Sequence, residues 1–284
     1  MPRKKVNYGL VDSLPDPKDY HFGSLEKKVL EKNGDWTPFL PEFEKQVGTY
    51  QDTWACVTFS ALNCLEIIFK RRYNFEVNFS DRFTAKMSGT IPGKGNTLKR
   101  VADSIRNDGF LLEEDYYWDR KSKEKYYQRI PDYYGNIQYP HTPLKGRANI
   151  IRDSYEVSYE WVGWNGLSRE QLSEALIYGP LQVTVMAWKA PKNGVYDYTD
   201  QNINHAVTLL RVNKDGSLVI FDSYDDSIKV LSKRFYIGHA MQFSLDIRSL
   251  NPVTFANLYL TNHGRLPKLR EYSEYLRTGF LPFI

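Results

Sequence analysis

The fold is decided by the stretch Gln51-Asp-Thr-Trp-Ala-Cys56-Val-Thr-Phe-Ser60, which opens the strongest helical pattern in the chain. From Cys56 to about Arg71, apolar side chains recur at helical spacing, and the polar side chains between them leave only a narrow stripe. The basic end of this segment, Lys70-Arg-Arg72, complements the negative pole of a helix dipole. We therefore expect a mostly buried helix that begins at Cys56.

A cysteine at the start of a helix lies against the positive end of the helix dipole, which favours the nucleophilic thiolate. The alternative for Cys56 is a small buried hydrophobic side chain, and this is our interpretation of Cys64, which lies in mid-helix without polar neighbours. On a helix the two cysteines are separated by about 12 Å along the axis, too far for a disulfide. Two free thiols suit a reducing, cytoplasmic setting, although association with a phage or virus particle is compatible with them too.

A nucleophilic thiol needs a base, and the base needs a group that orients it. Among the five histidines, only His205 lies inside a strong pattern, at the entry of a strand expected over Ala206–Val212. Asp222 follows 17 residues after His205, at the end of the next expected strand, Leu218–Phe221. Adjacent antiparallel strands joined by a short turn place their outer ends side by side. His205 and Asp222 are therefore expected to face each other.

The remaining segments divide the chain into a helical first half and a β-rich second half. Helices are expected over Thr97 to about Asn107 and over Ser168–Tyr178, where Ser168 and Gln171 form a capping-box pattern. Residues 113–165 are aromatic, charged and interrupted by prolines, so we expect a long irregular segment that covers the surface. Strands are then expected over Leu181–Met186, Ala206–Val212, Leu218–Phe221 and Ile228–Leu231. This order indicates an α+β protein.

Several short motifs occur in the order found in one known family. They are Gln51–Ser60, Gly93-Lys-Gly95-Asn96, Glu113-Glu-Asp-Tyr-Tyr-Trp118, Gly179–Val185, Gly194-Val-Tyr196, Asn204-His-Ala-Val207 and Phe221-Asp-Ser-Tyr224. Together with the opening Gly9–Tyr20, they resemble a papain-like (C1-type) cysteine peptidase of the compact kind found in bacteria, archaea and their phages. The resemblance covers roughly residues 9–245. His205 follows Cys56 by 149 positions, close to the spacing of ~130–150 in papain-type enzymes.

The resemblance implies a two-lobe fold. A helical lobe, about residues 50–120, would carry the buried central helix and pack against an antiparallel, β-barrel-like lobe of about residues 165–250. Both lobes would belong to a peptidase domain of residues 36–250. An N-terminal arm, residues 1–35, would precede this domain, and a C-terminal extension, residues 251–284, would follow it and pack on it.

The resemblance also implies a cysteine-type endopeptidase that needs no cofactor and no metal ion. The nucleophile, the base, the orienting group and the oxyanion donor would be Cys56, His205, Asp222 and Gln51. A polypeptide substrate would lie extended in the groove between the lobes, against Gly93, Gly95, Asn204 and Tyr224.

Departures from the family pattern keep other functions open. Gln51 lies five residues before Cys56, one fewer than usual, and Trp54-Ala55 stands where small residues are usual. Asp222 replaces an asparagine, which favours the charged form of the histidine, and Tyr224 replaces a tryptophan. The alternatives are a catalytically inactive structural or binding protein with the same fold, and a cysteine amidase or acyl transferase acting on cell-wall or isopeptide bonds.

The composition excludes several other classes of protein. The 284 residues include 38 Lys and Arg against 34 Asp and Glu, a formal charge of +4 that is too weak to indicate a nucleic-acid partner. With 42% hydrophobic and 25% charged residues, the chain is neither disordered nor a disulfide scaffold. No run approaches about 18 apolar residues and no secretory signal is present, so no membrane partner is expected. The histidines and cysteines lack metal-ligand spacing, and the oligomeric state is left open.

Overall fold

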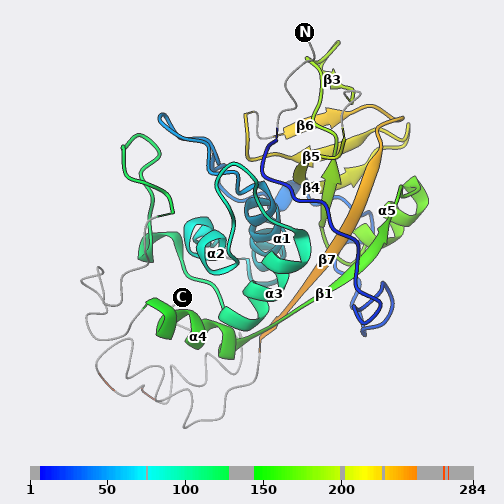
Figure 1. The fold of residues 1–284 in the computed structure, drawn as a ribbon. Coiled ribbons are helices and arrows are strands. Elements are labelled where there is room, and N and C mark those ends of the chain that lie inside the picture. The colour runs from blue at the N-terminus through cyan, green and yellow to red at the C-terminus, as the bar shows by residue number, and fades with distance from the viewer. Residues whose placement is uncertain are drawn as a thin grey trace.

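The computed structural model describes residues 7–74, 76–127, 144–198, 202–225 and 228–247, together with Arg265 and Lys268. Most of the helices gather on one side of a long twisted sheet and helix α5 lies on its other side (Figure 1), which confirms the α+β class. The helices are α1 (Cys56–Tyr73), α2 (Asp81–Met87), α3 (Leu98–Asp108), α4 (Leu144–Ser154) and α5 (Arg169–Leu176), with 3-10 turns at Thr37–Phe39 and Glu113–Asp115. The strands are β1 (Tyr155–Trp164), β2 (Leu181–Val185), β3 (Val195–Tyr196), β4 (His205–Val212), β5 (Leu218–Phe221), β6 (Ile228–Leu231) and β7 (Ile237–Ile247).

The central helix α1 begins at Cys56, as its apolar pattern predicts. Every residue from Cys56 to Phe69 is buried. One side of the helix packs on β2, β4 and β7, and another side packs on α2 and α3. The helix ends at Tyr73, and the next residue, Asn74, adopts a left-handed conformation with φ of 51° and donates its N–H to the Lys70 carbonyl. Burial on all sides fixes the start of α1, and with it Cys56, in the interior.

The strands form one sheet in the order β1-β7-β2-β4-β5-β6-β3. Neighbouring strands are antiparallel except β3 and β6, which are parallel. The sheet is open, so the barrel-like closure expected from the sequence is wrong. Closure needs continuous hydrogen bonding between the two edge strands, and β3 has only two residues to offer to the ten-residue strand β1.

The expectation of an irregular segment over residues 113–165 is wrong for residues 144–164, which form α4 and β1. β1 pairs with β7 along nearly its whole length. The buried side chains of β1 include Tyr155, Val157, Tyr159 and Trp161, which follow the two-residue period of a strand. The period is present in the sequence, but the abundance of aromatic and charged residues around it favoured a surface segment.

The predicted capping box at Ser168 is confirmed, whereas Thr97, expected as the first residue of its helix, is instead the cap of α3. Thr97 precedes α3, and its side chain accepts a hydrogen bond from the N–H of Arg100. Ser168 precedes α5 and forms a complete capping box with Gln171. These caps fix where the two helices begin without help from distant parts of the chain.

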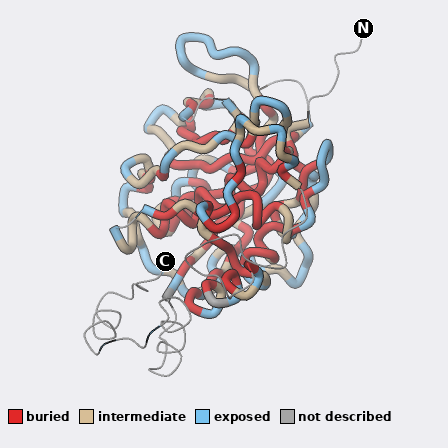
Figure 2. Tube along the Cα trace, turned by 90° about the vertical axis from the view of Figure 1, so that its left-hand side faces the viewer, coloured by how far each residue is buried: buried red, intermediate tan, exposed pale blue. Residues whose placement is uncertain are grey.

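The hydrophobic interior has two large parts. One part joins α1 and α3 to β1 and β7, and the other joins α5 to β2, β4 and β5. Figure 2 shows these buried segments in the middle of the molecule, with exposed loops around them. The N-terminal segment, drawn in dark blue in Figure 1, crosses the molecule next to the start of β4, where Tyr8 donates its N–H to the carbonyl of Asn204 at 3.2 Å.

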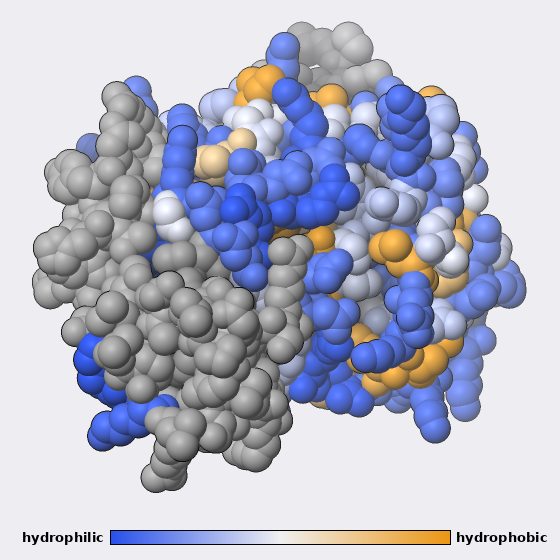
Figure 3. All heavy atoms as spheres, turned by 90° about the horizontal axis from the view of Figure 1, so that it is seen from below, coloured by the Kyte–Doolittle hydropathy of each residue, from blue (hydrophilic) through white to orange (hydrophobic). Residues whose placement is uncertain are grey.

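Parts of the predicted organisation lie outside the described residues. These are residues 1–6 of the arm and, apart from Arg265 and Lys268, the C-terminal extension of residues 251–284, whose packing stays a prediction. Among the described residues, no helix is both long and apolar enough to cross a membrane. On the face drawn in Figure 3, the coloured surface is mainly hydrophilic, and hydrophobic side chains form separate patches.

Candidate active site

Three of the predicted site residues come together where α1 meets the sheet. Cys56 is the first residue of α1, and His205 is the first residue of β4. β5 pairs with β4 so that Phe221 lies opposite Thr208. Asp222, the next residue, is therefore beside the start of β4. The strand-turn-strand unit expected from the sequence thus brings the histidine and the aspartate to the same end of the sheet.

The contact between histidine and aspartate is a short hydrogen bond in a fully buried setting. His205 Nε2 lies 2.7 Å from Asp222 Oδ1, and both side chains are 0% exposed. Within the described part of the chain, Nδ1 of the same ring has no hydrogen-bond partner, and the Cys56 thiol interacts with the ring. A base held through one nitrogen, with the other nitrogen left for a thiol, is the arrangement that nucleophilic catalysis requires.

The surroundings favour a protonated His205 and an ionised Asp222. Burial alone lowers the pKa of the His205 imidazole, but the charge and hydrogen bond of Asp222, and then the Cys56 thiol, outweigh burial and raise this pKa to about 10. Burial alone raises the pKa of Asp222, but His205 and Lys229 outweigh it and hold the pKa below its usual range. Lys229 Nζ lies 2.8 Å from Asp222 Oδ2. The carboxylate therefore lies between two cations.

The glutamine predicted for the oxyanion hole is bonded to another segment. Gln51 Nε2 donates to the carbonyl of Glu124 at 2.6 Å, and its Oε1 accepts the N–H of Tyr126 at 3.5 Å. The short connection to the nucleophile is also strained, since Trp54 adopts a φ of 51° that favours glycine. The oxyanion role of Gln51 stays a prediction.

A second glutamine, which no sequence motif singled out, is fixed beside the aspartate. Gln46 is fully buried, and its Nε2 donates to the carbonyl of Tyr8 at 3.1 Å and to Asp52 Oδ1 at 3.3 Å. Its Oε1 accepts the hydroxyl of Ser223 at 3.2 Å, and its N–H donates to the Ser223 carbonyl at 2.8 Å. Ser223 directly follows Asp222. Gln46 lies ten residues before the nucleophile, a spacing outside the family pattern, so only the fold reveals it.

Two of the predicted substrate-binding residues, Gly93 and Gly95, lie against the N-terminal arm. Asn7 Nδ2 donates to the carbonyl of Gly93 at 3.5 Å. The N–H of Asn96 donates to the carbonyl of Gly9 at 3.0 Å. A Cβ on Gly95 would lie 1.7 Å from the Gly9 oxygen, so this close approach requires a glycine. The glycine loop therefore holds an extended segment of the chain's own arm.

The other two predicted substrate-binding residues, Asn204 and Tyr224, contact the same arm beside His205. Tyr8 is bonded to Asn204, and its ring centroid lies 4.6 Å from that of Tyr224 and 5.1 Å from that of His205. Both Cys56 and His205 are 0% exposed. The arm therefore covers His205, and neither of these two side chains is accessible to a substrate in this structure.

A second buried charged cluster lies between α2 and the loop that precedes α1. Oxygens of Glu44, Asp81 and Glu113 lie within 4.8 Å of one another. Arg120 lies among them, at 3.4 Å from Glu44, 3.5 Å from Asp81 and 3.8 Å from Glu113. Burial and the neighbouring carboxylates raise the pKa of Glu113 to about 10 and that of Glu44 to about 7. Because the guanidinium and bound protons balance these charges, we assign no metal ion to the cluster.

The two cysteines are free, as predicted. Burial raises the pKa of the Cys64 thiol, which lies in the middle of α1. This thiol is therefore a structural side chain, and it serves as an internal reference for the reactivity of Cys56.

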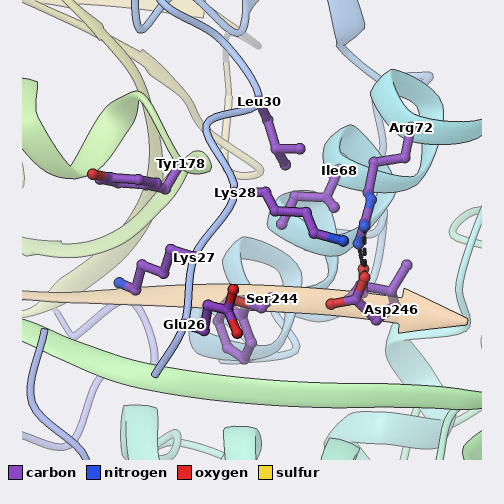
Figure 4. Close-up of a pocket in the computed structure, with 11 residues that line it drawn as sticks. Glu26, Lys27, Lys28, Leu30, Ile68, Arg72, Tyr178, Ser244 and Asp246 are labelled. Carbon is purple, nitrogen blue, oxygen red and sulfur yellow. Dashed lines mark hydrogen bonds and ion pairs between the residues drawn. The ribbon is translucent and has the colours of Figure 1, made fainter. Parts of the chain in front are cut away.

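A cavity of about 310 Å³ lies between the arm, the end of α1 and β7. Figure 4 shows the ion pair between Arg72 and Asp246 at one side of it. Lys27, also in its lining, pairs with Glu160. Its lining includes none of the predicted site residues.

Comparison with solved structures shows known relatives of the fold. The chain is similar to the bromelain protease from Ananas comosus in complex with the E64 inhibitor, at 17% identity and a TM-score of 0.52, covering 75% of this chain and 98% of that one. It is also similar to the Carica candamarcensis cysteine protease in complex with E-64, at 14% identity and a TM-score of 0.50. This similarity covers 74% of this chain and 96% of that one. A third similar structure is digestive procathepsin L 3 of Tenebrio molitor larval midgut, at 14% identity and a TM-score of 0.50, covering 84% and 76%. No protein-family model and no curated protein matches the sequence.

Proposed function

We propose that this chain, which has the papain-like fold, is a cysteine-type endopeptidase. The observation that carries the proposal is the line of contacts from Asp222 through His205 to Cys56 at the start of α1. The similar structures are cysteine proteases, which supports the same chemistry for this arrangement. The compact prokaryotic or phage origin suggested by the sequence stays a prediction.

The proposed reaction uses the three side chains in turn. The Cys56 thiolate attacks the carbonyl carbon of the scissile bond, a C–S bond forms, and the carbonyl oxygen takes the negative charge. His205, as an imidazolium, gives its proton to the leaving nitrogen as the C–N bond breaks. Water then hydrolyses the thioester, neutral His205 accepts the proton of that water, and the thiolate is released. Asp222 holds Nε2 throughout, so that Nδ1 serves the reacting atoms.

The oxyanion would be held by two donors. One is the N–H of Cys56, because the first N–H groups of a helix have no partner within it. For the side-chain donor we favour Gln46 over Gln51, because Gln46 Nε2 already holds a backbone carbonyl, that of Tyr8, whereas Gln51 is bonded to Glu124. We expect Gln46→Met to lower kcat about 10²–10³-fold and Gln51→Met to lower it far less. If Gln51→Met lowered kcat more than Gln46→Met did, Gln51 would be the side-chain donor, as the sequence predicted.

A polypeptide substrate would replace the arm beside the start of β4. The backbone groups that now bind the arm, those of Gly93, Asn96 and Asn204, would then pair with the substrate. This exchange predicts that weakening the arm increases access to Cys56. Tyr8→Ala is the suitable variant, since the Tyr8 ring packs on the catalytic histidine.

Selective labelling of the thiols tests the proposal. The native protein is treated near pH 6 with a limiting amount of a peptide-like epoxide or of iodoacetamide, and the adduct is located by mass spectrometry. We expect Cys56 to react and Cys64 to remain free, faster reaction in Tyr8→Ala, and loss of the fast reaction in His205→Ala. Hydrolysis of an unfolded protein substrate by the same variants should follow the same order.

The alternative of an inactive binding protein is favoured by one observation, the complete burial of Cys56 and His205 beneath the arm. The Tyr8→Ala variant separates the two readings. If its Cys56 reacts with iodoacetamide no faster when His205 is present than when His205 is replaced by alanine, the thiol is not activated. That outcome rejects the peptidase and supports the binding protein.

A further inference from the structure

Strand β6 buries a lysine where its sequence would favour an apolar side chain. In Ile228-Lys-Val-Leu231 the buried positions are Lys229 and Leu231, whereas Ile228 is 47% exposed. Lysine is almost never fully buried unless it is paired, yet Lys229 is only 1% exposed. Exposing an isoleucine in order to bury a lysine costs free energy, and such a break in the pattern is typical of functional sites.

The buried ammonium of Lys229 contacts the oxygen of Asp222 that does not bind His205. Lys229 Nζ lies 2.8 Å from Asp222 Oδ2, while Asp222 Oδ1 lies 2.7 Å from His205 Nε2. Pairing of β5 with β6 places Lys229 opposite Ile220, two residues before Asp222. Nζ also contacts Asp225, whose side chain is 54% exposed. Each oxygen of the buried carboxylate therefore has its own cationic partner.

One aromatic side chain covers both cations. The Trp188 ring lies 5.5 Å from the His205 ring and 5.0 Å from Lys229 Nζ. The Tyr196 ring lies 5.6 Å from the same ammonium, and both rings can stabilise it by cation–π attraction. Ion pairs act more strongly where water is excluded, and Asp222 is 0% exposed. Lys229 therefore acts on the aspartate at close range and without competing water.

We propose that Lys229 is a positioning residue of the active site: its ammonium holds one oxygen of Asp222 so that the other oxygen remains aimed at His205. It also offsets part of the carboxylate charge that retains the proton on His205. An uncompensated carboxylate would hold the imidazolium too tightly for rapid transfer of its proton to a leaving amine. This inference rests on the proposed function and deepens it.

The test follows His205 directly and needs no substrate. In protein labelled with ¹⁵N-histidine, the His205 signals, assigned with His205→Ala, are followed by NMR as the pH is lowered. The groups facing Asp222 are His205, Lys229 and Tyr8, together with the N–H of Tyr224, which donates to Oδ1 at 3.2 Å; Asp225 lies beyond Lys229, and Cys56 lies beyond the imidazole. When the pH is lowered far enough, Asp222 takes up a proton and the signal of its hydrogen bond to His205 Nε2 is lost. Because Lys229 lowers the pKa of Asp222, this loss should occur at a pH about one to three units higher in Lys229→Met.

Two further variants distinguish positioning from mere packing. Lys229→Arg keeps the positive charge and should restore most of the shift, while Lys233→Met, at an exposed lysine four residues later, should leave the titration unchanged. In peptide hydrolysis, Lys229→Met should lower kcat about tenfold or more with little change in KM. An unshifted titration in a folded Lys229→Met protein would overturn the proposal.

If Lys229→Met does not fold, a double variant decides the question. Asp222→Asn combined with Lys229→Met leaves neither buried charge unpaired, and a lysine that acts through the aspartate should then have no further effect on the His205 signals compared with Asp222→Asn alone. A large further change overturns the proposal. If the wild-type protein hydrolyses no peptide, the proposed function fails, while the NMR result for Lys229 is read independently.

Discussion

The two buried charged clusters of this protein differ in the number of cations that they offer to each carboxyl group. The aspartate cluster consists of Asp222, His205, Lys229 and the half-exposed Asp225. The arginine cluster consists of Arg120, Glu44, Asp81 and Glu113. In the first, cations outweigh burial and lower the pKa of Asp222; in the second, burial and like charges raise the pKa of Glu113 to about 10. Cation-rich surroundings keep a carboxylate ionised, and carboxylate-rich surroundings keep it protonated.

This difference matches what each cluster holds in place. The aspartate cluster orients the His205 ring, and the catalytic role that we propose for this ring requires a permanently charged carboxylate. The arginine cluster instead holds the loop before α1, because Arg120 Nε donates to the Lys45 carbonyl at 2.6 Å and the Arg120 carbonyl accepts the N–H of Thr49 at 2.8 Å. A loop can be held equally well by protonated carboxyl groups. The two clusters should therefore respond differently to loss of a charge and to pH.

The largest effect is expected from removing the shared carboxylate of the aspartate cluster. Asp222→Ala leaves two buried cations without their main partner, which should lower the free energy of unfolding by about 3–5 kcal/mol. Urea unfolding at pH 7 measures it. Asp153→Ala removes the partner of Arg152 at the surface, where the aspartate is 59% exposed, and should cost less than about 1 kcal/mol. Similar losses in both variants would show that the buried cations are not held by Asp222.

A smaller loss of stability, which changes with pH, is expected from removing the cation of the arginine cluster. Arg120→Met should lower the free energy of unfolding at pH 8 by roughly 2–3 kcal/mol, because protonation relieves part of the ~3–5 kcal/mol that an unpaired buried charge costs. The loss should shrink as the pH falls to 5, where the carboxyl groups take up protons. Urea unfolding at both pH values measures it. A loss that grows on acidification would contradict the assigned charges.

Much of the fold and part of the site could be predicted because they depend on local sequence. The start of α1, the cap at Ser168, and the approach of His205 to Asp222 each arise from a single helix end or one strand-turn-strand unit. The open sheet could not be predicted, since it depends on a two-residue edge strand.

The rest of the site depends on side chains that meet across long stretches of chain. Gln46 reaches Ser223 over 177 residues, and Glu44 reaches Arg120 from a different loop. No periodic pattern records such contacts. Lys229 is close to Asp222 in sequence, but the strand expected over Ile228–Leu231 does not show which of its faces is buried, so the burial of Lys229 became visible only in the fold.

A modest pH effect is expected from Glu44 in the arginine cluster. Its pKa is raised from an ordinary 4.5 to about 7, mainly by burial and by Asp81. A raised pKa gives stability that is full below pH 4.5 and lost as the pH rises through 7. The melting temperature of Glu44→Gln should therefore fall less between pH 4.5 and 7 than that of the wild type. Glu76→Gln is the control, since Lys70 lowers the pKa of Glu76; an equal change in both variants would refute the assignment.

The smallest effect is expected at the rim of the aspartate cluster. Asp225 shares Lys229 with Asp222, but its side chain is 54% exposed. Asp225→Asn should therefore lower the free energy of unfolding by only about 0–1 kcal/mol, and 0.5 M salt should abolish this loss by screening while leaving the loss in Asp222→Ala nearly intact. Urea unfolding at low and high salt measures both. If Asp225→Asn proved as damaging as Asp222→Ala, the lysine would be anchored from the rim, and Asp222 would owe its orientation to His205 and to the N–H of Tyr224.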